Sequence, residues 1–411
     1  MGSSRILGLK TISHILTYSG LLIFSLGAPF SLAMATMGVS IAFSGLLLGS
    51  KWKEWKFAHP LIFITLAWFL VYLWDIWNHH LSNPKDLKAL WTFVIPLLVA
   101  FPISYPWPRR IALIFLYSVL IASILGLVPF FFSLKPPFGH PIGMGVFCFT
   151  GGKLSCGGFF AIAFSLYLSL ILFWNGKRYS VIFWIGGLSA FLMVIFSLCR
   201  SYYVALGLSF PLFILFSKRI YSRNYWVKSL LIGFGFLFLI SGISILHPPV
   251  KKKIASIFDY HRYSQYPSIQ ERLHMWEMAW RVFKDHPITG AGFYSWKHLD
   301  NYFKAMKDSG KNIFCRCHPH SNIFTALAEG GIVGLLCLFT YFFFLFRNAL
   351  NIINQTIVGS FGQALAIGLL IATFAVFIGG LFEYNIVDDE IVIPLFVLHS
   401  LIRNFKEKTT T

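Results

Sequence analysis

The sequence predicts an all-α polytopic integral membrane protein, first because of its composition. Of the 411 residues, 57% are hydrophobic and only 12% are charged, and the mean hydropathy is +0.70. About a quarter of the residues of a typical soluble protein are charged. The second reason is arrangement, because the apolar residues form blocks of bilayer-spanning length and the basic residues lie between them. A water-soluble enzyme, a disordered regulator and a fibrous protein are therefore excluded. The net charge of +19 is explained by membrane topology and not by nucleic-acid binding.

About twelve blocks have the length and apolar character of a membrane-spanning helix, which needs roughly 20 residues. The first two are joined so tightly at Pro29–Ser31 that they form either two spans or a re-entrant pair. We expect no cleavable signal near Met1, because the first block runs straight into the second. The predicted spans are 13–31, 33–50, 59–77, 89–105, 111–133, 157–174, 180–199, 202–217, 229–247, 322–346, 361–382 and 389–404.

The distribution of basic residues predicts which ends of the spans face the cytoplasm. With both termini inside, the cytoplasmic segments hold 17 basic residues and only two acidic ones, Glu54 and Glu407. The outer side holds the other 17 basic residues together with 13 acidic ones. Short loops that are rich in Lys and Arg remain in the cytoplasm. We therefore expect an even number of spans and two cytoplasmic termini.

These spans divide the chain into three parts. Residues 1–247 contain spans one to nine, 248–321 form a large outer loop with a net charge of +6, and 322–411 contain the last three spans and a short tail. Within the loop, Ser268–His286 has the pattern of an amphipathic helix, with Ser268 and Glu271 as a capping box and Pro287 after its end. A second helix is expected at Trp296–Lys307, ended by Gly310. The apolar stripe of the first helix is formed by Ile269, Leu273, Trp276, Trp280 and Phe283.

Three charged or titratable side chains at the outer membrane face are candidate site residues. Arg200 lies at the outer end of a tight pair of apolar runs, and His320 lies just before the tenth span. Such positions mark function more often than structure, although an Arg at this depth can also extend to lipid headgroups by itself. Arg272 lies beside the apolar stripe, one turn before Trp276, so it can be directed towards whatever the stripe covers.

Two guanidiniums and an imidazole form a set suited to displacing a lipid-linked diphosphate. Guanidinium groups bind phosphate oxygens through paired donors and remain charged. An imidazole can take the proton of an attacking hydroxyl near neutral pH. The Arg pair would neutralise the charge of the leaving group, a role that a metal ion often fills. The only acidic cluster in the outer segments is Asp388–Glu390, so we expect no metal and no cofactor.

Four cysteines fall in the predicted outer segments: Cys148, Cys156, Cys315 and Cys317. On an oxidising side of the membrane they permit a disulfide between the loops, with three possible pairings. Zinc binding by Cys315, Cys317, His318 and His320 is the weaker hypothesis, because this spacing is too cramped for one tetrahedral site.

Three local patterns, in this order and spacing, make the sequence resemble the O-antigen ligase family, whose superfamily includes O-antigen polymerases and bacterial protein O-oligosaccharyltransferases. The resemblance also covers the layout of the whole chain, with about twelve spans and one large late outer loop. The patterns are Phe196–Ser201 around Arg200, then Ser268–Gly292 with Arg272 and a Pro-Gly turn, and then His320–Gly334 with Glu329.

The resemblance implies an enzyme of lipopolysaccharide biosynthesis in the bacterial inner membrane, with its site on the periplasmic face. It would transfer O-antigen polysaccharide from undecaprenyl diphosphate to a sugar hydroxyl of lipid A-core. The implied partners are these two substrates and membrane lipid. By the same resemblance, Arg200 and Arg272 bind the pyrophosphate, and His320 acts as the base or orients the acceptor. Supporting roles fall to Glu329, His318, Trp276 and Asp389.

Two alternative functions remain open. An O-antigen polymerase would join lipid-linked repeats by the same chemistry, and sequence alone separates it poorly from a ligase. A transporter of lipid-linked sugars would need polar residues at mid-span and broken helices in matched halves, and the spans have neither pattern. A protein oligosaccharyltransferase is less expected, because those enzymes usually carry a longer C-terminal extension.

Overall fold

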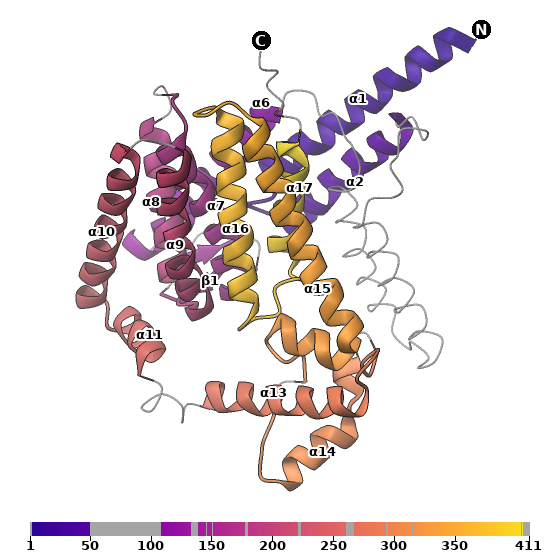
Figure 1. The fold of residues 1–411 in the computed structure, drawn as a ribbon, viewed down its shortest axis with the longest axis vertical. Helices are drawn as coiled ribbons and strands as arrows, with labels where there is room; N and C mark the ends of the chain where they lie inside the picture. Colours follow the sequence, from indigo (N-terminus) through magenta and orange to yellow (C-terminus); the bar gives the residue numbers. More distant parts are fainter. Residues whose placement is uncertain are drawn as a thin grey trace.

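The computed structural model describes residues 2–49, 108–132, 139–144, 146–149, 151–176, 180–220, 223–259, 267–292, 295–314, 316–403 and 405. These residues contain 13 α-helices, one 3-10 helix and one two-stranded hairpin (Figure 1). The predicted all-α class is confirmed. The predicted spans at 59–77 and 89–105 lie outside the described residues.

Ten of the twelve predicted spans coincide with helices. Six of these helices, α6, α7, α9, α10, α15 and α16, are long and apolar enough to cross a membrane. The chain is therefore a multi-pass membrane protein, while the total of twelve spans stays a prediction. The ten helices are α1 (Gly2–Gly27), α2 (Leu32–Gly49), α6 (Pro108–Phe132), α7 (Lys153–Phe173), α8 (Ser180–Phe196), α9 (Arg200–Ile220), α10 (Arg223–Leu246), α15 (Asn322–Gln355), α16 (Phe361–Gly380) and α17 (Asp389–Ile402).

The centre of the bundle is formed by α7 and α16, which are buried along most of their length. They approach closely at Gly368, where a Cβ atom would lie 3.0 Å from the Leu166 Cα. Small residues allow such close helix contacts inside a membrane. In contrast, α10 lies at the edge of the bundle (Figure 1) and exposes large apolar side chains such as Phe238, which is 83% exposed. An apolar surface of this kind is suited to contact with lipid.

The first two helices form a tight hairpin that also depends on glycine. A Cβ atom on Gly20 would lie 2.2 Å from the Ala42 amide nitrogen, and one on Gly38 would lie 2.4 Å from that of Phe24. A side chain at either position would push the two backbones apart.

The described part of the predicted outer segment 134–156 contains secondary structure that the sequence pattern did not predict. Strands β1 (His140–Ile142) and β2 (Val146–Cys148) pair antiparallel. Between them, Gly143 has φ +53 and Met144 donates its amide to the Phe196 carbonyl at 2.9 Å. The hairpin therefore packs on the end of α8, next to the segment that leads to Arg200.

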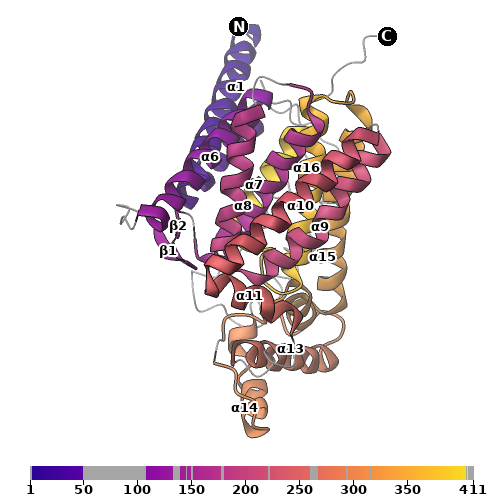
Figure 2. The same ribbon diagram turned by 90° about the vertical axis from the view of Figure 1, so that its left-hand side faces the viewer.

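The large outer loop contains α11 (Pro248–Phe258), α13 (Pro267–Asp285), the 3-10 helix η4 (Ser295–His298) and α14 (Asp300–Asp308). Helix α13 lies crosswise beneath the bundle, at the end opposite to the start of α1 and the end of α17 (Figures 1 and 2). Helices α13, η4 and α14 share a separate small core made of Met275, Met278, Ala279, Val282, Trp296, Phe303 and Met306, together with Ala328 of α15. The buried Val250 of α11 belongs instead to the core of the bundle.

The structure corrects three details of the predicted loop. The buried face of α13 is centred on Met278 and Val282, whereas Trp280 of the predicted stripe is 45% exposed. The helix begins at Pro267, so Ser268 is inside it and Glu271 instead accepts the Phe314 amide at 2.7 Å. The second predicted helix is divided into η4 and α14. Hydropathy spacing predicted the helix correctly but assigned its buried face to the wrong residues. The reason is that methionine and alanine side chains form much of that face.

Candidate functional site

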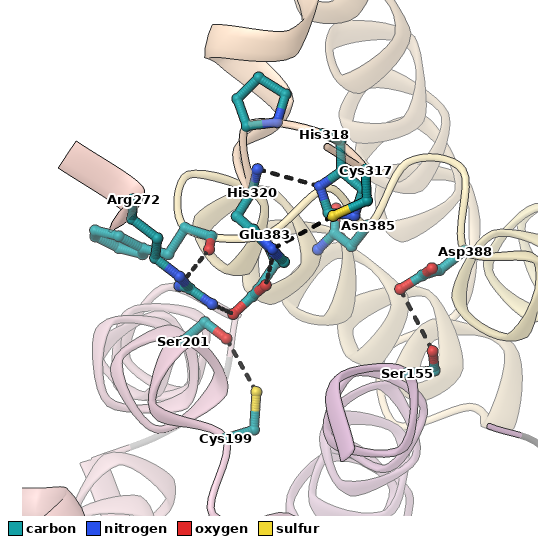
Figure 3. A network of polar contacts seen from close by, with 12 residues as sticks. Ser155, Cys199, Ser201, Arg272, Cys317, His318, His320, Glu383, Asn385 and Asp388 are labelled. Carbon is teal, nitrogen blue, oxygen red and sulfur yellow. Dashed lines mark hydrogen bonds and ion pairs between the residues drawn. The ribbon is translucent and has the colours of Figure 1, made fainter. Parts of the chain in front are cut away.

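Three segments that are distant in sequence meet beneath the bundle. Helix α13 provides Arg272, the segment before α15 provides His320, and the connection between α16 and α17 provides Glu383 (Figure 3). The sequence analysis selected Arg272 and His320 as members of one set with Arg200, and the structure places these two on either side of a carboxylate that the sequence analysis did not select.

Arg272 is held by two acceptors on the α16–α17 connection. Its Nη1 donates to the Phe382 carbonyl and its Nη2 to the Glu383 Oε1, each at 2.8 Å. Because the two donors engage two separate acceptors, the plane of the guanidinium is fixed. The side chain is 25% exposed, so part of it remains open to a ligand.

Glu383 joins the arginine to the histidine. Glu383 is 4% exposed. Its Oε1 accepts a hydrogen bond from Arg272 Nη2, and its Oε2 lies 3.4 Å from His320 Nδ1. A buried carboxylate needs partners of this kind to offset its desolvation. The sequence analysis selected Asp389 from the acidic cluster at 388–390 and gave Glu383 no role. The available signal was a carboxylate immediately after an apolar span.

His320 is positioned by an unusual backbone conformation and by its neighbour. Its φ is +53, a left-handed value that few non-glycine residues adopt. The His320 amide donates to His318 Nδ1 at 3.1 Å, and Ser321 caps α15 by accepting from the Phe324 amide. Burial, and then the charges of His320 and Arg272, lower the pKa of His318 to about 3. His318 is therefore a neutral acceptor that supports His320, while His320 faces the carboxylate.

Trp276 fixes α13 against the same segment. Its indole Nε1 donates to the Pro319 carbonyl at 3.0 Å, and its ring stacks on Phe324 with 5.1 Å between centroids. Trp276 lies one turn after Arg272 on α13. These contacts hold α13, and with it Arg272, against the segment that carries His320. The supporting role of Trp276 stays a prediction.

The predicted Pro-Gly turn at 287–292 docks on a kink in α15. The kink is at Gly331, with φ +59 and ψ −150, and a Cβ atom there would lie 2.5 Å from the Ile288 carbonyl carbon. A Cβ atom on Gly290 would lie 2.4 Å from the Glu329 carbonyl carbon. Four backbone hydrogen bonds join the two segments: Ala291 to Ala328, Gly292 to Glu329, Ile332 to Pro287 and Val333 to Ile288. This joint fixes the end of α13 and hence the position of Arg272.

Glu329 belongs to this joint. Its carboxylate Oε1 accepts the Trp296 amide at 3.4 Å, and the residue is 5% exposed. The predicted supporting residue therefore lies at the contact between α15 and the small core of the outer loop.

Arg200 is the first residue of α9, two residues after Leu198, whose φ is also left-handed at +57. Its Nη1 donates to the Ser256 hydroxyl of α11 at 3.3 Å. It lies close enough to Arg272 and Glu383 for their charges to act on it. The structure therefore brings the two predicted guanidiniums into one region, but they have different partners.

A buried polar chain connects α9 to the other two segments of the site. Asn322 donates to Asn385 Oδ1 at 2.8 Å, and Asn385 donates to the Tyr202 hydroxyl at 2.9 Å. All three side chains are buried. A buried network of satisfied polar groups holds its members in one arrangement. Sequence reasoning gave none of these residues a role in the site.

The carboxylates next to Glu383 form a partly buried acidic group. Ser155 donates to Asp388 Oδ2 at 3.5 Å, at the start of α17 (Figure 3). Burial, and then the charges of Glu390 and Glu383, raise the pKa of Asp388 to about 7. The predicted supporting residue Asp389 is the first residue of α17 and raises this pKa further.

The bonding state of the cysteines tests the predicted disulfide and the zinc hypothesis. Cys148 and Cys156 are buried free thiols, so a disulfide from either of them to the large loop is wrong. Cys317 is disulfide-bonded, and Cys315 lies outside the described residues. The Cys317, His318 and His320 ligand atoms lie within 4.8 Å of one another. A disulfide sulfur is not the thiolate that zinc requires, so this group does not fit a zinc site.

A family model agrees with the part of the chain that carries these residues. Residues 185–339 match the model described as O-antigen ligase. This segment begins in α8, ends in α15, and contains Arg200, Arg272 and His320. Over this segment, the resemblance predicted from the sequence is confirmed. Glu383 and Asp388 lie beyond it.

One curated relative adds a second, partial likeness. It is named "Putative polysaccharide ligase", comes from Rickettsia prowazekii (strain Madrid E), and is 30% identical over 175 residues. The match covers 41% of this chain and 40% of the relative. The chain therefore spans about two fifths of the length of that relative.

Proposed function

We propose that this protein transfers a glycan from a polyprenyl diphosphate carrier to a sugar hydroxyl, and that it acts as an O-antigen ligase with lipid A-core as acceptor. The observation that carries the proposal is the buried Glu383, which contacts Arg272 at 2.8 Å and lies 3.4 Å from His320. One carboxylate thereby positions a phosphate-binding cation next to a proton acceptor. The family match supports glycan transfer in general.

His320 is the proposed general base. In the tautomer that carries its proton on Nδ1, which lies 3.4 Å from Glu383 Oε2, His320 has its lone pair on Nε2 for the acceptor. The acceptor hydroxyl gives its proton to Nε2, and its oxygen attacks the anomeric carbon of the donor glycan. The bond between that carbon and the diphosphate oxygen breaks, so the electron pair leaves with the carrier. Glu383 stabilises the imidazolium that forms.

Arg272 and Arg200 are the proposed ligands of the leaving group. Two negative phosphates develop further charge when the glycosidic bond breaks, and fixed cations stabilise this charge without reorganisation. Arg272 is already oriented by Phe382 and Glu383, whereas Arg200 donates from Nη1 to the neutral hydroxyl of Ser256. The diphosphate would lie between them, on the side of the bundle covered by α13.

Transfer by the purified full-length protein in nanodiscs tests the proposal. With an undecaprenyl-diphosphate-linked glycan as donor and lipid A-core as acceptor, we expect wild-type transfer and a loss of kcat of about 10²–10⁴-fold in His320→Asn. Asparagine tolerates the left-handed backbone at this position, so the fold is preserved. His286→Ala, at an exposed histidine after α13, is the matched control and should remain within twofold of wild type.

Two further measurements separate the alternatives. In a deletion strain, a ligase defect leaves lipid A-core bare while polymerised lipid-linked O-antigen accumulates, whereas a polymerase defect leaves single repeats on the core. Lipopolysaccharide gels distinguish these outcomes. Full activity in excess chelator supports the expected metal-independent chemistry, and a loss that Mg²⁺ restores contradicts it. Wild-type transfer by His320→Asn would contradict the role of His320.

A further inference from the structure

Helix α11 brings a lysine next to Arg200. The Ser256 hydroxyl accepts from Arg200 Nη1 at 3.3 Å and donates to the Lys253 carbonyl at 2.7 Å. Residues three apart on a helix share a face, so Lys253 and Ser256 lie on the same side of α11. The face of α11 that contacts Arg200 therefore also carries a second cation.

The charges around Lys253 are mostly of the same sign. Lys253 is half-buried, and burial is the first cause that lowers its pKa, followed by the charges of Arg200 and Lys153. Lys153 is the first residue of α7. Cations gathered in a partly desolvated place repel one another, and an anion that binds among them removes this cost.

The surroundings of α11 indicate what kind of anion would bind there. Helix α10 leads into α11, and the apolar side chains at this junction are open, with Ile245 80% exposed and Leu246 75% exposed. At the other end of α11, Phe258 is 83% exposed. The side chain of Arg200 reaches α11 from the start of a membrane-spanning helix. Cations at the boundary of a lipid-facing surface are suited to a phosphate that carries a long apolar chain.

We propose that Lys253 is a direct ligand of the donor diphosphate, acting with Arg200 on the phosphate that carries the polyprenyl chain, while Arg272 binds nearer to the glycan. This inference rests on the proposed function and adds a residue to the same site. It also gives the donor a direction, with the prenyl chain along α10 and the glycan towards His320.

A structural alternative is that Lys253 only contacts phospholipid headgroups. In that case Lys251, which is exposed on the same helix, should matter as much as Lys253. Lys251→Ala is therefore the matched control. Phosphatidylcholine nanodiscs, which have no net negative charge, remove the contribution of anionic lipid.

The first test compares steady-state kinetics of full-length variants in these nanodiscs. We expect Lys253→Ala to raise KM for the lipid-linked donor roughly tenfold, the size expected for one charge-assisted contact, with kcat within twofold. Lys253→Arg should restore most of the affinity, and Lys251→Ala should behave as wild type. Equal KM in wild type and Lys253→Ala, or equal losses in both lysine variants, would overturn the inference.

The second test needs no transfer reaction and uses farnesyl diphosphate as the probe. It should stabilise wild type and Lys251→Ala against thermal unfolding, and this shift should be largely lost in Lys253→Ala. Without the probe, Lys253→Ala should unfold no earlier than wild type, because the substitution removes repulsion. Lys253-dependent binding without glycan transfer would contradict the proposed function alone, whereas normal transfer with Lys253-independent binding would contradict the inference alone.

Discussion

The two arginines of the site have different direct partners. We call Arg272, Glu383 and His320 the acid-balanced side, and Arg200, Lys253 and Lys153 the cationic side. On the first, a buried carboxylate contacts the guanidinium at 2.8 Å and approaches the imidazole. On the second, Arg200 donates to a serine hydroxyl, and Lys253 beside it has both Arg200 and Lys153 as cationic neighbours. The charge of Glu383 also acts on Arg200, but the guanidinium that it contacts at 2.8 Å is that of Arg272. The same residue type is therefore oriented in one place and available to an anion in the other.

This difference suggests a division of work between the two sides. A cation that is already paired contributes orientation, and its carboxylate can also stabilise a protonated base. A cation among like charges gains most from a bound phosphate. We expect changes on the acid-balanced side to lower kcat and changes on the cationic side to raise KM for the donor.

The largest expected effect comes from Glu383→Gln. The amide keeps the shape of the side chain but loses the charge that Arg272 and His320 share, so kcat should fall about 10²–10³-fold with little change in KM. Initial rates at saturating donor measure this.

Glu277→Gln is the matched control for that substitution. Glu277 is paired with Arg281 at 2.8 Å and with Lys311 at 2.5 Å, but it lies on the open flank of α13. A surface pair contributes about 0–1 kcal/mol, so transfer should remain within twofold of wild type. If Glu383→Gln had the same small effect as this control, the acid-balanced side would have no catalytic role.

Two arginine-to-lysine substitutions should distinguish the acid-balanced side from the cationic side, with kinetic effects of intermediate size. Arg272→Lys leaves one ammonium for two acceptors, Phe382 and Glu383, so the group loses its orientation and kcat should fall roughly tenfold to a hundredfold. Arg200→Lys keeps the charge near the donor and should mainly raise KM, by about tenfold. Steady-state kinetics over a range of donor concentrations separates these effects. The same kcat loss with unchanged KM in both variants would remove the distinction.

The smallest expected effect concerns stability near the acid-balanced side. The pKa of Asp388 is about 7 in the fold, against an ordinary value of 3.8. Between these values the folded state binds more protons than the unfolded state, so stability falls as pH rises through this window. Asp388→Asn removes the penalty and should raise Tm above pH 7.5 by a few degrees, with little change near pH 4. Thermal unfolding in detergent measures this. Asp308→Asn, on the exposed end of α14, is the control. If Asp388→Asn shifted Tm equally above pH 7.5 and near pH 4, the raised pKa of Asp388 would not be the cause.

Much of the fold was predictable from the sequence, because the membrane imposes a simple rule on it. A helix satisfies its own backbone hydrogen bonds, so every long apolar block becomes a helix whatever its neighbours are. The described spans and α13 follow from this rule and from amphipathic spacing. The buried face of α13 was not predictable, because Met278 and Val282 share a core with Trp296 and Phe303 of the following segment.

The site divides in the same way. Arg200, Arg272 and His320 stand out in the sequence because charge at the edge of a bilayer is costly. Glu383 does not stand out from the acidic residues that follow it until the structure shows it buried against Arg272 and His320. Similarly, Lys253 looks like one of three consecutive lysines until α11 packs beside Arg200.

By itself, the sequence determined the class of the protein, the helical segments described above and the residue types available for phosphate and proton chemistry. Only the tertiary structure decided which of these residues have partners. Hydropathy and periodicity are local properties of the chain, whereas the contacts of Arg272, Glu383 and His320 join segments more than 45 residues apart. Long-range pairing depends on how helices pack, and here it depends on Gly290 and Gly331 allowing α13 and α15 to dock closely.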